Sequence, residues 1–150
     1  MTRSPRARDG AAMTDDALPD LLMPRDHERL QGVHQDLVRV VMLARQYTPF
    51  IVLEGLRNVE RQAKLVQIGA SRTMNSRHLT GHAVDLGCWL DDGDGKVENG
   101  EVRWDWPLYD KLGRVMKRVA AQLGVQIIWG GDWQSFPDGP HFELDRRFYP

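Results

Sequence analysis

The 150-residue sequence has a single cysteine, no excess of charge of either sign and no long apolar run. One cysteine, Cys88, excludes an internal disulfide and every zinc site that needs two thiolates. The 20 Lys and Arg against 21 Asp and Glu give a formal net charge of −1, so the usual reason to expect nucleic-acid or anionic-membrane binding is missing. No stretch approaches the roughly 18 apolar residues of a transmembrane helix. Any bound transition metal must therefore be held by the five histidines and by carboxylates.

The hydrophobic share, 41% of the residues, is enough for one core of ordinary size. No internal repeat or linker divides the chain. We therefore expect a disordered leader at residues 1–25 and a single domain at residues 26–150. The leader has no apolar stretch of signal-peptide length, which predicts a chain made in the cytosol.

The spacing of apolar residues predicts an α+β fold. Helices are expected at 34–47, at 59–68 after the N-cap Asn58, and from segment 105–107 to a stop at Gly124. Strands are expected at 50–53, 82–86, 126–129 and 141–144. Because strands and helices do not alternate regularly in the second half, we expect a small, mainly antiparallel sheet packed by helices.

Two polar segments could together hold a metal ion. Segment 76–85 (SRHLTGHAVD) leads from a loop into a strand, which can bring His78 and Asp85 to one point. Segment 138–143 (DGPHFE) offers His141 as a third ligand, and two imidazoles with one carboxylate leave a position open for water, as a catalytic zinc site requires. Asp138 would then lie near that water and could accept its proton.

Both segments resemble the signature of the M15 family of metallopeptidases, which includes D-alanyl-D-alanine dipeptidases and carboxypeptidases. The matching residues are Ser76, His78, Gly81, Ala83 and Asp85, followed by Asp138, Pro140 and His141. Within that family the chain is similar to the VanY-like, L-alanyl-D-glutamate peptidase branch of bacteriophage endolysins. Further similar segments are 54–57 (EGLR), 60–62 (ERQ), 104–107 (WDWP) and 129–133 (WGGDW), so the resemblance covers residues 30–150.

The resemblance implies roles for the residues of the two segments. It implies that His78, Asp85 and His141 bind one catalytic zinc ion and that Asp138 is the general base. Ser76, the serine of the motif, is placed behind the ligands or at the substrate. The implied architecture is the zinc-peptidase fold that this family shares with hedgehog-like and DD-peptidase-like domains.

Two residues outside the segments are assigned to the substrate. The resemblance implies that Arg57 is catalytic and helps to hold and polarise the substrate, whereas a salt bridge to Glu54 or Glu60 is the structural alternative. Trp133, in a glycine-rich loop before the second segment, is the candidate for a wall of the substrate groove. For the remaining tryptophans core packing is expected, namely Trp89, Trp104, Trp106 and Trp129.

Two other residues with reactive side chains, His82 and Cys88, are interpreted as structural. His82 lies four residues from His78, but Gly81 argues against the helix that an H-x-x-x-H zinc motif requires. On a strand, His82 would point away from the face that carries Asp85. Cys88 is expected to be a small buried residue, because no base or orienting group is available to a thiol nucleophile.

The resemblance implies a zinc-dependent peptidoglycan peptidase, an endolysin that cuts the stem peptide at the L-alanyl-D-glutamate bond. A D-alanyl-D-alanine carboxypeptidase would use the same metal centre and is the alternative enzyme. A non-catalytic cell-wall-binding or calcium-binding module on the same fold is the alternative of another class. The expected partner is bacterial peptidoglycan, with no nucleic acid, no stable membrane association and a monomer favoured. The expected location is the host bacterial cytoplasm until release to the cell wall.

An acidic loop at residues 91–101 is a separate candidate for calcium. With Gly95 placed as the central glycine of an EF-hand loop, four acids fall at ligand-type positions, namely Asp92, Asp94, Glu98 and Glu101. Leu90 stands where the first aspartate should be, and Lys96 is off pattern. Some related endolysins are thought to be calcium-regulated, so a weak calcium site is one interpretation, and a plain solvated loop is favoured.

Overall fold

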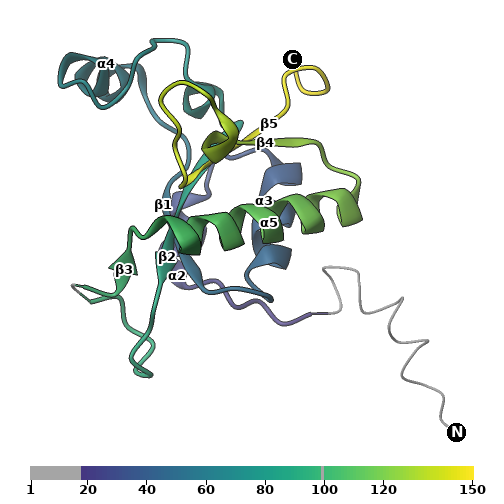
Figure 1. Ribbon diagram of the computed structural model, residues 1–150. Coiled ribbons are helices and arrows are strands. Elements are labelled where there is room, and N and C mark those ends of the chain that lie inside the picture. The colour runs from purple at the N-terminus through teal and green to yellow at the C-terminus, as the bar shows by residue number, and fades with distance from the viewer. Residues whose placement is uncertain (1–17, 99) are drawn as a thin grey trace, which may run out of the picture.

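The computed structural model describes residues 18–98 and 100–150, which form an α+β fold around an antiparallel sheet, as the sequence predicts (Figure 1). The strands are β1 (Phe50–Glu54), β2 (Ala83–Trp89), β3 (Val102–Arg103), β4 (Ile127–Trp129) and β5 (His141–Leu144). The sheet order is β1-β2-β5-β4, and β3 pairs with β2. The helices are α2 (Pro24–Arg29), α3 (Gln35–Ala44), α4 (Val59–Gln67) and α5 (Trp106–Leu123), with 3-10 helices η2 (Arg77–Thr80) and η3 (Gly130–Asp132).

The core lies between the sheet and the helices α3 and α5. Helix α5 packs against α3 and against β2 and β4 (Figure 1). Alternate residues of β2 and β5 enter this core and are fully buried, namely Val84, Leu86, Phe142 and Leu144. Each large apolar side chain so buried contributes roughly 1.5–3 kcal/mol. Because side chains alternate along a strand, the intervening residues of β2 and β5 lie on the other face, where polar groups do not disturb this core.

The start of the domain differs from the prediction. Residues 1–17 of the predicted leader lie outside the described residues. Leu22 is buried in the core and α2 begins at Pro24, so the ordered domain begins before the predicted boundary at residue 25. The physical reason is that Leu18 and Leu22 supply apolar surface that packs on the core.

Most predicted elements are present with small shifts at their ends. The Asn58 carboxamide oxygen accepts a hydrogen bond from the Arg61 amide at 2.7 Å and caps α4, and Gly124 ends α5 with a φ of 73°. The expectation of core packing holds for Trp89 and Trp129 but is wrong for Trp104 and Trp106, which are 61% and 48% exposed. Trp104 directly follows β3 and Trp106 is the first residue of α5, ahead of the residues of this helix that enter the core.

Helix α4 stands apart from the α3–α5 core (Figure 1). Gln62 is its one buried residue, whereas α5 buries seven. Within residues 18–98 and 100–150, no helix combines the length and the apolar character needed to cross a membrane. Helix α4 therefore contributes little to the core, and its inner side chains are available to line a site.

Candidate active site

Strands β2 and β5 bring two of the predicted ligands together. Asp85 and His141 are direct partners in the antiparallel register. Directly opposed residues have neighbouring side chains on one face of the sheet. Because the core takes the alternate residues, Asp85 and His141 project from the face opposite α5.

The third ligand comes from η2, the 3-10 turn before β2. The hydroxyl of Ser76 accepts a hydrogen bond from the His78 amide at 3.2 Å and caps this turn. Gly81 ends the turn with a φ of 76°, and a Cβ there would lie 2.1 Å from the Gly32 carbonyl oxygen. The serine and the glycine of the sequence motif thus shape the turn that carries His78.

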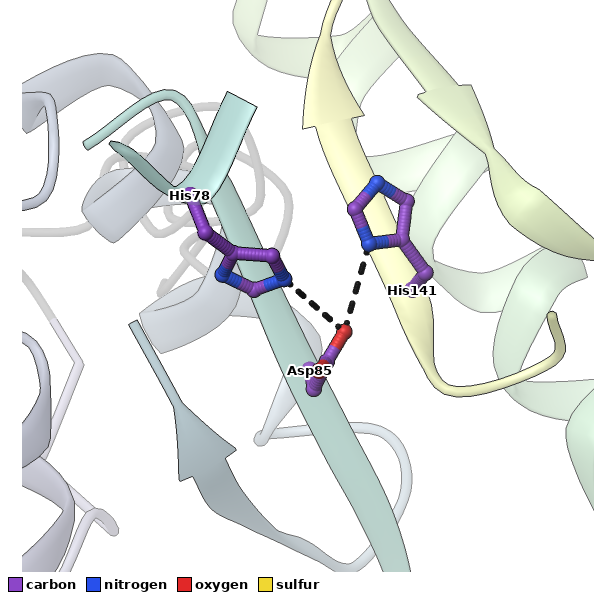
Figure 2. A group of neighbouring side chains, drawn as sticks. All are labelled: His78, Asp85 and His141. Carbon is purple, nitrogen blue, oxygen red and sulfur yellow. Dashed lines mark hydrogen bonds and ion pairs between the residues drawn. The ribbon is translucent and has the colours of Figure 1, made fainter. Parts of the chain in front are cut away.

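Figure 2 shows the imidazoles of His78 and His141 directed at the same carboxylate oxygen of Asp85. The distances to Asp85 Oδ1 are 3.2 Å from His78 Nε2 and 3.3 Å from His141 Nδ1. One potential ligand atom from each residue lies within 4.8 Å of the other two. Both histidines are buried, at 1% and 6% exposure.

The other nitrogen of each imidazole is fixed by the fold. His78 Nδ1 donates to the Gly55 carbonyl at 2.7 Å, and His141 Nε2 contacts Glu143 Oε1 at 2.8 Å. Such outer partners set the tautomer and orientation of histidine ligands. Sequence reasoning missed Glu143 in this role, although a residue two positions after His141 on a strand shares its face.

The pKa values of Asp85 and His141 are both shifted by the contacts within the cluster and with Glu143. Burial would raise the pKa of Asp85, but hydrogen bonds from His141 and His78 hold it well below its usual range. Burial would lower the pKa of His141, yet its bonds to Asp85 and Glu143 raise it to about 9. The Asp85 carboxylate is therefore ionised, and two imidazole nitrogens with one carboxylate oxygen are a donor set that suits a divalent metal such as zinc.

Asp138 lines the same pocket and is held by the loop that precedes β5. Its amide donates to the Gly130 carbonyl at 2.9 Å, and its carbonyl accepts from the His141 amide at 3.2 Å. Burial and the nearby charge of Asp85 raise the pKa of the Asp138 carboxyl above its ordinary value. A carboxyl group with a raised pKa next to a metal centre suits general acid–base chemistry.

Arg57 has features of both interpretations drawn from the sequence, namely a salt bridge to a glutamate and a place at the site. Its Nη2 lies 2.7 Å from Glu54 Oε1 and 3.5 Å from Asp85 Oδ2, and its Nη1 donates to Gln62 Oε1 at 2.8 Å. The salt bridge to Glu54 exists, and no ion pair to Glu60 is present among the described residues. Arg57 also lines the pocket, so it can orient Asp85 while facing the site.

The group of His78, Asp85 and His141, the candidate metal ligands, is called the metal cluster below. The pocket beside it has a volume of about 570 Å³. Ser76 and Trp133 line it, together with Arg61 and Leu65 of α4. The Trp133 ring lies 5.0 Å from the His141 ring, centroid to centroid. This volume is typical of a site for a small molecule or a short peptide.

The residues interpreted as structural lie outside this site. His82 is not part of the described metal cluster, and its ring lies 5.6 Å from that of His34. Cys88 is buried, and burial raises the pKa of its thiol to about 11, so it is a poor nucleophile.

The acidic loop forms a second group of carboxylates, made of Asp91, Asp92, Asp94 and Glu101. The EF-hand alignment places Asp92, Asp94 and Glu101 in the group, but it misses Asp91 and it includes Glu98, which the group does not. Calcium binding by this loop stays a prediction.

Comparisons with known proteins agree with the geometry. A family model described as the phage L-alanyl-D-glutamate peptidase matches residues 21–150. An L-alanyl-D-glutamate peptidase of Listeria phage A118 is 38% identical over 99 residues, which are 66% of this chain and only 31% of that protein. The peptidoglycan L-alanyl-D-glutamate endopeptidase CwlK of Bacillus subtilis (strain 168) is 26% identical over 148 residues, covering 87% of this chain and 81% of CwlK.

A solved structure extends the likeness to three dimensions. The L-Ala D-Glu endopeptidase ChiX of Serratia marcescens is similar with a TM-score of 0.74 and 45% identity, covering 85% of this chain and 91% of ChiX. This match confirms the predicted fold. The family model spans every element from α2 to β5 and all three residues of the metal cluster, and the chain therefore belongs to the phage L-alanyl-D-glutamate peptidase family.

Proposed function

We propose that the protein is a zinc-dependent peptidoglycan peptidase of the endolysin type that hydrolyses the L-alanyl-D-glutamate bond of the stem peptide. The observation that carries this proposal is the cluster of His78, Asp85 and His141, in which both imidazoles are buried, with Asp138 in the same pocket. The activity named for the phage A118, CwlK and ChiX proteins supports the choice of bond.

His78 Nε2, His141 Nδ1 and a carboxylate oxygen of Asp85 would hold the metal, since these atoms converge and the outer nitrogens are already bonded. When bound, zinc lowers the pKa of a water molecule to about 7 and polarises the scissile carbonyl. Asp138 accepts the proton of the attacking water and passes it to the leaving amine. Its raised pKa places it closer to the working pH for both transfers.

Arg57 and the pocket walls position the reacting peptide. The guanidinium of Arg57 is always charged, so it can stabilise the negative charge that develops on the carbonyl oxygen. Ser76 holds the His78 turn from the pocket side, and the Trp133 ring shields His141 and offers an apolar wall.

The proposal extends to the setting of the reaction. The catalytic domain includes residues 26–150 together with the preceding residues Leu18 and Leu22, which pack on its core. Peptidoglycan is the partner, and the chain acts as a monomer. The protein stays in the host cytoplasm until it is released to the wall.

Mass spectrometry of purified peptidoglycan digested with the zinc-loaded protein tests the reaction. The proposal expects new C-terminal L-alanine on the muramyl side. Release of free D-alanine would instead support the D-alanyl-D-alanine carboxypeptidase. A protein that contains no stoichiometric zinc and releases no product would support the non-catalytic module.

A further inference from the structure

The pocket is lined by five arginines, which differ in how their charge is compensated: Arg57, Arg61, Arg72, Arg77 and Arg146. Arg57 and Arg61 share the carboxylate of Glu54, and Arg57 also meets Asp85. Among the described residues, no ion pair joins a carboxylate to any of the other three. Arg57 already faces two carboxylates and is assigned to the carbonyl oxygen of the scissile bond, so a further carboxylate of the substrate needs another cation.

Arg72 is held in place by neutral groups. Its Nη1 donates to the Ser135 hydroxyl at 3.0 Å, and its guanidinium carbon lies 5.3 Å from the centre of the Phe136 ring. Phe136 has a φ of 57°, a conformation that a bulky residue rarely adopts. The ring lies under the guanidinium, and both residues line the pocket. The guanidinium of Arg72 is thus held in position by neutral partners, which leave its charge available to a ligand.

The chemistry of the proposed substrate fixes where a cation is needed. The leaving nitrogen belongs to D-glutamate, and the α-carboxylate of that residue is two bonds from it. Stem peptides continue through the side-chain carboxyl of D-glutamate, so the α-carboxylate is free. Asp138 must reach the leaving nitrogen to protonate it, within roughly 2.6–3.2 Å. The free carboxylate therefore lies on the Asp138 side of the pocket.

Arg72 is the uncompensated arginine on that side. Its partner Phe136 is two residues from Asp138, so the Cα atoms of Phe136 and Asp138 are at most roughly 7 Å apart. Arg146 follows the far end of β5 and donates to the Asn75 carbonyl at 3.1 Å. Arg77 is buried and donates to the Leu144 and Tyr149 carbonyls.

We propose that Arg72, set against Ser135 and Phe136, binds the free α-carboxylate of the D-glutamyl residue and so determines specificity for the acid over its amide. This rests on the proposed function. A planar guanidinium can donate two parallel hydrogen bonds to the two oxygens of a carboxylate, whereas a carboxamide offers one acceptor oxygen.

The test uses two muramyl tripeptides that differ only in an α-carboxylate or an α-carboxamide on D-glutamate. With the zinc-loaded native protein, kcat/KM is expected to be about tenfold higher for the carboxylate. Arg72→Gln should remove that preference by lowering kcat/KM for the carboxylate peptide while leaving kcat/KM for the carboxamide peptide unchanged. Arg72→Lys should restore part of the preference. Arg61→Gln is the matched control, because Arg61 lines the same pocket but is paired with Glu54, and it should leave the ratio unchanged.

A binding measurement separates this inference from the proposed function. Calorimetry with zinc-loaded Asp138→Asn protein should show the same preference in affinity, which Arg72→Gln should abolish. Equal losses on both peptides, or a preference that survives Arg72→Gln, would overturn the assignment of Arg72. Failure of the proposed function has another signature, since the native protein would then release no product from either peptide while the binding preference could still be measured.

Discussion

The cluster of His78, Asp85 and His141 and the acidic loop at residues 91–101 both bring potential ligand atoms within 4.8 Å of one another. In the metal cluster both imidazoles are buried, and their outer nitrogens are bonded to Gly55 and Glu143. In the acidic loop the three aspartates are exposed and Glu101 alone is buried.

The two regions also differ in what their oxygens already bind. Asp91 accepts from the amides of Gly93 and Gly95, and Glu101 accepts from the Trp89 indole and two backbone amides. The loop thus satisfies its carboxylates internally, whereas the metal cluster is anchored from outside and directs its inner atoms at one point. Proximity of acids is common on protein surfaces, and anchoring with burial is what distinguishes a metal centre.

The largest effect is expected from Asp85→Ala. Removing the carboxylate leaves two imidazoles without the anion that draws a cation to them. Zinc should be lost and hydrolysis should fall by more than the roughly 100-fold expected for an outer partner. Elemental analysis and a peptidoglycan assay measure both, with Asp92→Ala in the acidic loop as the control. Stoichiometric zinc in Asp85→Ala would break the distinction between the two regions.

Asp138→Asn should separate catalysis from metal binding. The amide cannot accept a proton, so hydrolysis should fall about 10²- to 10⁴-fold. The three ligands are untouched, and zinc content should stay at the native level. Peptidase activity near the native rate would show that Asp138 is not the general base.

Glu143→Gln tests the anchoring of His141. A proton on His141 competes with zinc below its pKa of about 9, so apparent zinc affinity should rise with pH toward that value. The substitution removes the negative charge of Glu143, which helps to raise this pKa, so the rise should level off at a lower pH. The plateau affinity should be about 10- to 100-fold weaker.

Chelator competition across the pH range measures both quantities for Glu143→Gln. Glu98→Gln, a change of the same kind in the acidic loop, is the control. An unaltered pH profile in Glu143→Gln would mean that the contact with His141 does not tune the metal centre.

The smallest effect is expected from the double change Asp92→Asn and Asp94→Asn in the acidic loop. Zinc content and activity should remain within about twofold of native, since the loop carboxylates make no contact with the metal cluster. Calorimetry with calcium should give no heat in the zinc-loaded native protein. A heat of binding that the double change removes would show that the loop holds a cation too and would narrow the contrast between the regions.

The sequence predicted the order of the main elements and the three residues that the structure brings together as a metal cluster. Helix caps and strand alternation are local, so Asn58, Gly124 and the apolar strands could be placed from spacing alone. The exposure of Trp104 and Trp106 was not predictable in this way, because burial depends on what lies opposite a side chain in the folded chain. The short β3 and η2 were missed, since two to four residues give no period.

By itself the sequence determined the residue types of the site, because a motif records which side chains are present and in what order. The tertiary structure alone decided which groups support them. Gly55 and Glu143 orient the histidines, Glu54 and Asp85 share the charge of Arg57, and Arg72 rests on Phe136. Several of these contacts join segments far apart in the chain, and their distances and burial, which set pKa values and available charge, exist only once the sheet and its loops have packed.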